Sequence, residues 1–550
     1  MSARKFKDSQ LVDFVVVGSG AAGGVLAREL SQAGFDVVVL EQGPRLTPAD
    51  FKHDELSYWF ANGLTNNPVD NPQTYRNDPA AKATRTVDYP SLVYARLVGG
   101  SSVHFTANFW RFHEIDFHER SVLGEISGTG FADWPIDYAQ LEPYYTKVEW
   151  EIGVSGLAGA SPFDPPRSRP YPMPPLPVKS SGVLLERGAR KLGLHPFPAP
   201  MAIASQPFRG RPACVNCGFC LGYGCEVMAK SSTLFNMIPE AEATGRCEIR
   251  AESYVFQVRT DKKGRATGVA YYDRDKREHL QKARAVVVSA NGAETARLLL
   301  NSADARFPDG LANSSGLVGK YLMFNCGGDV GAVFEHELNE YKSVQVTRLV
   351  HDFYDSDPKR GFYGGGGIDG RLGPAPASWA LAATPQEPAW GAGFKANLRD
   401  FPRSMIAECH TTSLPVESNS VSIDPELKDA WGVPAMRSTY RDHPDDLAIS
   451  RFLQARAKDI LDAAGARKSW ILPTVDNSVG FHLLGTCRMG NDPQRSVVDR
   501  FHRTHDVPNL FLCDGSSFVT SGRGQPTMTI QALAFRAAEH IARFARNNEI

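Results

Sequence analysis

Apolar and polar positions near the start of the chain change period within a single short stretch. From Asp13 to Gly43 the sequence DFVVVGSGAAGGVLARELSQAGFDVVVLEQG contains an apolar run, a glycine-rich turn, a helical apolar pattern and a second apolar run that ends in an acid. Short apolar runs bounded by turn residues are typical of buried strands, and apolar residues spaced by three and four are typical of an amphipathic helix. The pattern therefore predicts strand, turn, helix and strand.

Later stretches of the chain divide into two kinds. Ala283–Ala303 and Asn509–Phe544 again predict a strand, a turn and a helix. Residues 325–470 do not show this strand-turn-helix pattern with its glycine turn. Within them, Glu417–Asp442 alternates apolar and polar residues around a turn, which predicts antiparallel strands. Gly361–Phe394 is rich in glycine, proline and tryptophan, and we expect it to form an irregular lid or active-site loop.

The first glycine turn indicates a nucleotide site. Gly18, Gly20 and Gly23 form the pattern G-x-G-x-x-G, and Glu41 follows at the distance expected of a ribose-binding carboxylate. Glycines let the backbone approach a pyrophosphate, and the following helix offers free N–H groups and a partial positive charge. A purely structural strand-turn-helix is the alternative. NAD and FAD both bind to this unit, so the turn alone does not choose between them.

Composition gives no indication of nucleic acid or a membrane as an obligate partner. The chain has 550 residues with 60 basic and 61 acidic side chains, so no charge bias indicates nucleic acid or an anionic membrane. No apolar run reaches the roughly 18 residues that a membrane span needs, and the first apolar run leads into the glycine turn, as expected of a strand rather than a signal peptide. Nine cysteines are few and odd in number, which argues against an extracellular disulfide framework.

Four segments in order carry a resemblance to a known family. They are the first strand-turn-helix, ARLVGGSSVHFTANFWRFHEIDF from Ala95 to Phe117, and the segments Ala283–Ala303 and Asn509–Phe544. Together they resemble the glucose-methanol-choline (GMC) oxidoreductases, flavoproteins that oxidise alcohols with FAD. Asp133–Gly156 and Arg169–Pro177 resemble the flavin subunits of bacterial gluconate and glucose dehydrogenases most, and pyranose-type sugar oxidases next.

The resemblance implies a fold and a division of the chain. We expect an α/β, Rossmann-like FAD-binding domain of GMC type and an α+β substrate domain with an antiparallel sheet. The FAD-binding domain would be discontinuous, comprising residues 1–160, 205–325 and 476–550. The substrate domain would comprise residues 161–204 and 326–475.

Alcohol oxidation needs a base for the hydroxyl proton, and histidine is the natural choice. His482, in GFHLLGTCRMG, matches the catalytic histidine of the family. The family usually places a second histidine or an asparagine before a Pro-Thr pair, and Gln525 stands there in SGRGQPTMTI. Its amide can donate and accept, although its extra methylene adds rotamer freedom. We expect Gln525 to line the substrate site; the alternative is that Arg523 or a substrate-domain residue has replaced it.

The resemblance also assigns residues around the flavin. The family implies that Gly99, Gly100 and Ser101 contact the cofactor and that Asp514 closes the phosphate-ribityl side of its pocket. His104 occupies the position that is covalently joined to the flavin in several members; packing against the flavin without a bond is the alternative. His113, His118, His502 and His505 lie in polar stretches, and we expect them at the surface.

Cys214, Cys217, Cys220 and Cys225 form one compact run, C-x2-C-x2-C-x4-C. Zinc sites prefer two separated pairs, so this spacing is closer to iron–sulfur ligation. The resembling dehydrogenases hold a three-iron cluster in a comparable segment, whereas other family members share such segments without one. An iron–sulfur cluster, a metal-free structural loop, zinc and a redox disulfide therefore all stay open.

The cysteine segment bears on the electron acceptor. A cluster would pass electrons to a cytochrome-type partner, and a small subunit would be expected beside it, whereas a flavin alone would need dioxygen, a quinone or a dye. The expected activity is oxidation of an alcohol or sugar hydroxyl by a dehydrogenase. An oxidase, a lyase of the same fold with no net redox chemistry, and a docking and electron-relay subunit are the alternatives. The expected location is cytoplasmic, or periplasmic by export with a partner.

Overall fold

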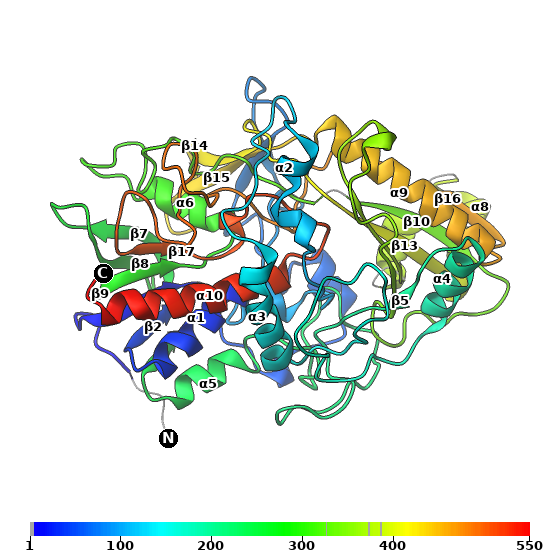
Figure 1. Ribbon diagram of the computed structural model, residues 1–550, viewed down its shortest axis with the longest axis horizontal. Coiled ribbons are helices and arrows are strands. Elements are labelled where there is room, and N and C mark those ends of the chain that lie inside the picture. The colour runs from blue at the N-terminus through cyan, green and yellow to red at the C-terminus, as the bar shows by residue number, and fades with distance from the viewer. Residues whose placement is uncertain (1–4, 326, 372–374, 386–387) are drawn as a thin grey trace.

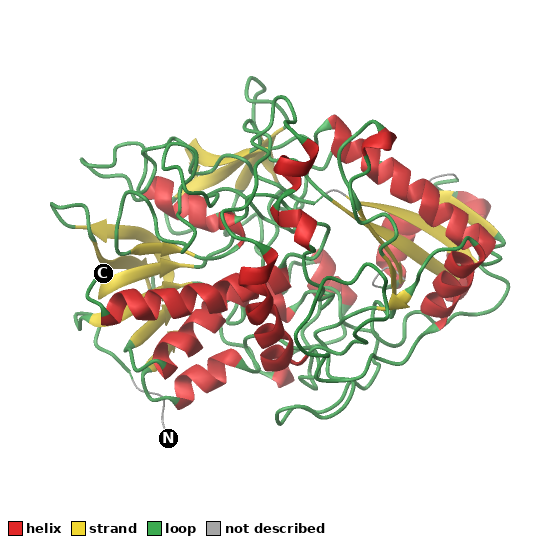
Figure 2. Ribbon diagram, in the orientation of Figure 1, coloured by secondary structure: helices red, strands yellow, loops and turns green. Residues whose placement is uncertain are grey.

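The structure is a computed structural model that describes residues 5–325, 327–371, 375–385 and 388–550. Two large sheets lie at opposite ends of the molecule, and Figure 2 shows that much of the chain between them is loop. Within the described ranges, each helix is too short or too polar to cross a bilayer.

The first large sheet is built around β1 (Val12–Val17), whose residues are almost all buried. Its parallel neighbours are β2 (Val37–Leu40) and β9 (Glu278–Val288). Strands covered on both faces of a parallel sheet carry continuous apolar runs, as these do. The remaining strands are β6 (Cys247–Arg250) parallel to β2, β17 (Leu510–Leu512) parallel to β9, and the antiparallel strands β7 (Tyr254–Thr260) and β8 (Ala266–Tyr272).

Helices from both ends of the sequence cover this sheet. α1 (Ala21–Gln32) follows the turn after β1 and packs against α10 (Thr527–Arg546), as the blue and red helices of Figure 1 show. α5 (Met237–Ala243) packs on α1, and α3 (Tyr138–Val148) packs on α10. With α6 (Glu294–Asn301) after β9, the predicted strand-turn-helix units are confirmed at all three places.

The second large sheet is antiparallel throughout. Its strand order is β16 (Lys468–Ile471), β10 (Gly327–Val333), β13 (Ser404–Thr411), β12 (Gly366–Arg371), β11 (Arg348–Val350) and β5 (Phe197–Pro198). α9 (Pro444–Ala463) and α4 (Ser180–Lys191) pack on one face, where a separate apolar core forms. The expected antiparallel sheet with flanking helices is confirmed.

A smaller sheet joins segments that are distant in sequence. β14 (Ser420–Lys428) and β15 (Pro434–Thr439) form the predicted antiparallel pair, and β15 runs parallel to β3 (Gln73–Arg76), which pairs with β4 (Thr84–Thr86). We propose the domain division given above, because the two large sheets fall on its two sides. The small sheet then spans the boundary between the two domains.

The expectation of an irregular lid over Gly361–Phe394 is wrong for its first half. Residues 366–371 form β12, a fully buried inner strand of the second sheet. Gly366 and Gly367 allow neighbouring groups to pack closely against this strand. A Cβ on Gly366 would lie 1.9 Å from the carbonyl oxygen of His410, and a Cβ on Gly367 would lie 2.7 Å from the ring of His351. Residues 372–374 and 386–387 lie outside the described ranges. The other short helices are α2 (Glu119–Leu123), α7 (Pro376–Ser378) and α8 (Gly391–Arg399).

Candidate active site

A cavity of about 860 Å³ lies between the two large sheets. Its wall includes most of the residues that the sequence assigned to a site, together with polar residues of the second sheet. The assigned residues in the wall are Gly18, Gly20, Glu41, Gly100, Ser101, His104, His482, Asp514 and Gln525. Gly23 and Gly99 stand behind the wall and shape the turns.

Two glycine turns meet at one end of this cavity. Gly18 has a φ of +92°, and a Cβ on it would lie 2.5 Å from the carbonyl oxygen of Ser289. A Cβ on Gly23 would lie 2.0 Å from the Gly18 carbonyl oxygen, and one on Gly100 would lie 2.7 Å from the Cα of Gly20. Only residues without side chains fit where these backbones approach one another.

The first turn of α1 is open to an anion. Gly20 is its N-cap, so no side chain caps the helix, and its first turn carries no acidic residue. The helix N-terminus therefore has free N–H groups and a positive end of its dipole beside the cavity, which suits a diphosphate.

Glu41 is buried directly after β2 and keeps part of its hydrogen-bonding capacity free. One carboxylate oxygen accepts from the Ser19 N–H at 3.1 Å and from the Ser19 hydroxyl at 2.8 Å, and the other accepts from the Gly43 N–H at 3.1 Å. Burial raises the pKa of Glu41, while these hydrogen bonds act in the opposite direction. A carboxylate can accept about four hydrogen bonds, so a ribose hydroxyl can be added to the three present.

Asp514 joins two loops that border the cavity. One of its oxygens accepts from the Asn291 N–H at 3.1 Å and the Thr295 hydroxyl at 2.6 Å, and the other accepts from the Ser516 N–H at 2.8 Å. The carboxylate thereby ties the turn after β17 to the turn after β9. Its contacts are those of a group that shapes the cavity wall.

His104 offers an unused polar atom to the cavity. Its Nε2 is buried and has no hydrogen-bond partner among the described residues. Burial, with a smaller contribution from Lys230, lowers the pKa of His104 to about 4, so the imidazole is neutral at neutral pH. A buried unpaired nitrogen is costly, and a polar group bound in the cavity would satisfy it.

His482 lies in an irregular segment that is held from two sides. Leu484 exchanges backbone hydrogen bonds with Met323 at 3.0 and 3.2 Å, and the Gly485 N–H donates to the Gly515 carbonyl at 3.0 Å. Burial, and to a lesser extent His410, lowers the pKa of His482 to about 4. The ring is therefore unprotonated at neutral pH and able to accept a proton.

The cavity-facing side of the second sheet is strongly polar. Asp329, Glu408 and Asp369 occupy directly opposite positions on β10, β13 and β12. The Arg371 guanidinium lies 2.7 Å from Glu408 and donates to Asp369 at 2.7 Å through Nε. Burial and the carboxylate of Glu408 raise the pKa of Asp329 to about 7. Although burial opposes it, Arg371 and His410 lower the pKa of Asp369 to about 2.

His410, also on β13, was not indicated by any sequence motif. Its Nε2 lies 2.5 Å from an Asp369 oxygen, and its Nδ1 lies 3.2 Å from the Gln525 amide nitrogen. Gln525 does line the cavity. Arg523 does not replace it, because its side chain is fully buried in ion pairs with Asp116 and Glu119. Only the alternation of β13 could have placed His410 on the polar face, and that strand was not predicted.

The expectation of surface positions is wrong for His113 and His502. The ring of His113 stacks on Tyr354 with centroids 3.5 Å apart, and His502 Nδ1 lies 3.0 Å from the Leu512 carbonyl oxygen. Burial lowers the pKa of each to about 3. Both are therefore neutral core residues in polar stretches, where sequence polarity misleads. His118 is exposed and His505 is half-buried.

The four-cysteine segment borders the cavity close to His104. Leu221 and Gly222 line the cavity, and the Gly222 N–H donates to the His104 carbonyl at 2.7 Å. None of these four cysteines forms a disulfide with another described residue, and Cys220 is the most buried of them. Burial raises the pKa of Cys214 to about 11 and that of Cys220 to about 12.

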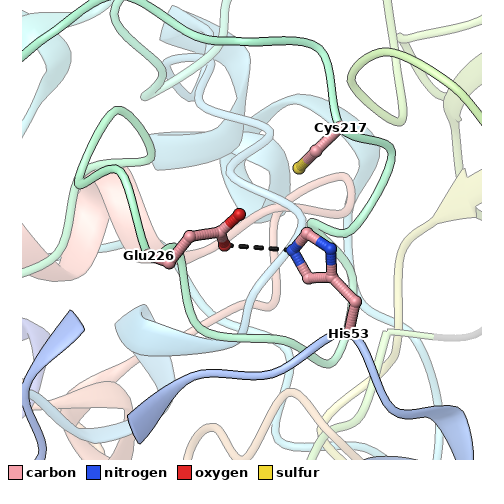
Figure 3. A group of neighbouring side chains, drawn as sticks. All are labelled: His53, Cys217 and Glu226. Atoms are coloured by element: carbon pink, nitrogen blue, oxygen red, sulfur yellow. Dashed lines mark hydrogen bonds and ion pairs between the residues drawn. The ribbon is translucent and has the colours of Figure 1, made fainter. Parts of the chain in front are cut away.

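A second donor set overlaps this segment. The ligand atoms of His53, Cys217 and Glu226 all lie within 4.8 Å of one another, and His53 Nε2 lies 3.0 Å from a Glu226 oxygen (Figure 3). The His53 ring stacks on Phe219 with centroids 4.0 Å apart. The sequence did not indicate His53 or Glu226, because His53 is distant from the cysteines along the chain.

The chain belongs to the GMC oxidoreductase family: the family models for its N- and C-terminal parts match residues 12–323 and 415–534. This family binds FAD, which the open glycine turns, Glu41 and the unpaired His104 nitrogen fit. The curated relatives that match along almost the whole chain include three that are dehydrogenases by name.

The first relative is the 2-methyl-1,2-propanediol dehydrogenase of Mycolicibacterium austroafricanum, 36% identical over 96% of this chain and 95% of its own length. The large subunit of fructose dehydrogenase from Gluconobacter japonicus is 31% identical over 96% and 97%. The gluconate 2-dehydrogenase flavoprotein of Pantoea cypripedii is 28% identical over 96% and 93%. The resemblance expected from the sequence is confirmed.

Proposed function

We propose that this protein oxidises an alcohol or sugar hydroxyl to a carbonyl with FAD, and that it works as a dehydrogenase. One observation carries the proposal: the imidazole of His482 and the amide of Gln525 line the same cavity as the two glycine turns and the α1 N-terminus. The three relatives described above are dehydrogenases by name. Two further relatives, 29% and 30% identical, are oxidases by name, so peroxide formation in air is the measurement that separates the two activities.

The chain's own residues then have distinct tasks. The turn at Gly18 and Gly20 would hold the FAD diphosphate, Glu41 the ribose, and His104 a polar group of the cofactor. Bound FAD supplies the acceptor for the hydride that leaves the alcohol carbon. His482 takes the hydroxyl proton on its ring nitrogen, which its low pKa leaves unprotonated. Gln525 binds the same oxygen through its amide.

The substrate is proposed to carry several hydroxyl groups. The wall opposite the glycine turns includes Asp329, Arg371 and Glu408, which offer acceptors and donors in a compact set. Polar sites of this kind reject analogues that leave their groups unpaired. The relatives act, by name, on a diol, a sugar and a sugar acid.

His104 decides how FAD is retained. Its neutral ring and unpaired Nε2 suit either a covalent bond to the flavin or a hydrogen bond to it. Acid precipitation separates the two: flavin released into the supernatant excludes the bond, and yellow colour in the pellet demonstrates it.

We further propose that electrons leave through the four-cysteine segment. In this proposal an iron–sulfur cluster would be ligated by Cys214, Cys217, Cys220 and Cys225. The segment lies against the cavity wall at His104, and one relative is by name a large subunit, which supports a small subunit beside this chain. We propose a cytochrome-type protein as the acceptor that such a cluster would serve. A single zinc ion at His53, Cys217 and Glu226 would be redox-inert. A metal-free loop would leave dioxygen or a quinone as acceptor.

Metal and sulfide measurements separate these cases. Iron and acid-labile sulfide with absorption beyond the flavin bands support the cluster; zinc alone supports the three-residue site; neither metal, with peroxide formed in air, supports an oxidase. A co-purifying subunit would also bear on location. If a partner is present, we propose export to the periplasm together with it; if none is present, we propose a cytoplasmic location.

Anaerobic titration tests the proposed activity. FAD-loaded protein is mixed with a panel of diols, sugars and sugar acids while the flavin absorption is followed. Bleaching by at least one compound, with the carbonyl product identified, is the expected result. A flavin that stays oxidised while a compound is cleaved would instead show a lyase.

A further inference from the structure

A chain of three side chains connects the second sheet to the reacting centre. His410 on β13 is 4% exposed, and both of its ring nitrogens have partners: Asp369 at 2.5 Å from Nε2 and Gln525 at 3.2 Å from Nδ1. Asp369 also accepts from Arg371. The imidazole is therefore fixed in orientation by a buried, charged neighbour on one side.

The chemistry of these groups orients the Gln525 amide. Asp369 is ionised and can only accept, so Nε2 of His410 carries the proton that is donated to it. In the tautomer that carries its proton on Nε2, Nδ1 is an acceptor. It lies 3.2 Å from the Gln525 amide nitrogen and 3.6 Å from a Glu408 carboxylate oxygen, which can only accept. Of the two ends of the Gln525 amide, only the nitrogen can donate to this Nδ1, which leaves the amide oxygen and a second N–H available to a ligand in the cavity.

The backbone supports this arrangement. Gly524 precedes Gln525 with a φ of +89°, and a Cβ on Gly524 would lie 2.8 Å from the Cβ of His410. The loop that carries Gln525 therefore passes directly against β13. A glutamine has one more rotatable bond than an asparagine, and ordering it is unfavourable unless a partner holds it. His410 is that partner.

We propose that Asp369 and His410 are positioning residues for Gln525: they fix its amide so that the free oxygen and N–H bind the reacting hydroxyl opposite His482. This inference rests on the proposed function.

Two matched variants of His410 separate the roles of its nitrogens. His410→Asn places an amide near the Nδ1 position and can still pair with Gln525, whereas His410→Gln places its amide near the Nε2 position and can pair only with Asp369. The rate constant of anaerobic flavin reduction is measured for both at saturating FAD, with FAD content and the unfolding transition as controls for folding.

We expect H410N to stay within about threefold of the wild type and H410Q to lose about tenfold, the value of one well-placed hydrogen bond. Q525A should lose about 10²-fold. The double variant H410Q/Q525A should be no slower than Q525A, because His410 acts through Gln525.

Losses that multiply in the double variant, or equal rates for H410N and H410Q, would overturn the inference. If H410Q does not retain FAD, Gln525→Glu tests the same hydrogen bond, because an ionised carboxylate cannot donate to Nδ1 of His410. A wild-type rate of flavin reduction in Q525E would also overturn the inference. A wild-type flavin that no alcohol reduces would refute the proposed function instead.

Discussion

Arg523 allows the sharpest prediction about what holds the site together. Its guanidinium is fully buried against Asp116 and Glu119, while the hydroxyls of Tyr354 and Tyr363 donate to these two acids at 2.6 and 2.8 Å. Arg523→Met would leave two carboxylates in a dry interior. Breaking a buried pair in this way costs about 3–5 kcal/mol.

The magnitude can be worked from protonation. An unpaired buried carboxyl becomes neutral, which costs about 1.4 kcal/mol for each pH unit above its ordinary pKa of about 4. At pH 7 one neutralised carboxyl costs about 4 kcal/mol and two cost about 8 kcal/mol. The lower figure is expected, because the two tyrosine hydroxyls donate to the acids and can keep one of them ionised. At pH 5 the cost of one falls to about 1 kcal/mol, because the unfolded chain is then also partly protonated.

Urea unfolding of FAD-saturated R523M and wild type at both pH values measures this difference. Arg523→Lys is the control: it keeps the charge, so it should lose less stability and show little dependence on pH. An R523M deficit that is the same at pH 5 and pH 7 would refute the reasoning from carboxylate neutralisation, and no deficit at all would refute the structural role of Arg523.

Three further predictions concern the cavity. His482→Ala should bind FAD but reduce it about 10²–10⁴-fold more slowly, as flavin bleaching will show. Gly100→Ala forces a Cβ to within 2.7 Å of the Gly20 Cα. Overpacking costs about 1–3 kcal/mol, so FAD affinity should fall about 5- to 150-fold if that cost is borne by the FAD-bound state. Gly124→Ala is the control: it shares the backbone strain of a positive φ, +86° against +56° at Gly100, but its Cβ meets nothing, so FAD affinity should be unchanged. Because the pKa of Asp329 is raised to about 7, the wild type loses folding stability as pH rises from about 4 through 7. Urea unfolding should therefore show Asp329→Asn to be about 2–4 kcal/mol more stable than the wild type at pH 8 and equally stable at pH 4.

The sequence indicates the cofactor side of the site because its chemistry is local. Gly18, Gly20 and Glu41 belong to one strand-turn-helix-strand unit, and the spacing within that unit determines where they lie. The same holds for Asp514, which caps a turn between a predicted strand and a predicted helix. Such residues are brought together by short-range structure, so a linear pattern is enough to predict them.

The substrate side depends on pairing between distant strands. Asp329, Asp369 and His410 meet only because β10, β12 and β13 are neighbours in register, and no local pattern encodes register between segments that lie far apart in the chain. The glycine-rich tract misled for the same reason: glycines required by close packing in β12 look like those of a loop. His53 and Cys217 likewise meet only in the folded chain.

The most direct test of the account follows the hydrogen that leaves the substrate. Anaerobic FAD-loaded protein is mixed rapidly with an alcohol that bleaches the flavin, carrying either hydrogen or deuterium on the carbinol carbon. We predict bleaching that is clearly slower with deuterium, because the carbon–hydrogen bond breaks as the flavin next to His482 is reduced. A colourless protein that takes up no FAD, or bleaching with no isotope effect together with an unchanged rate in H482A, would contradict it.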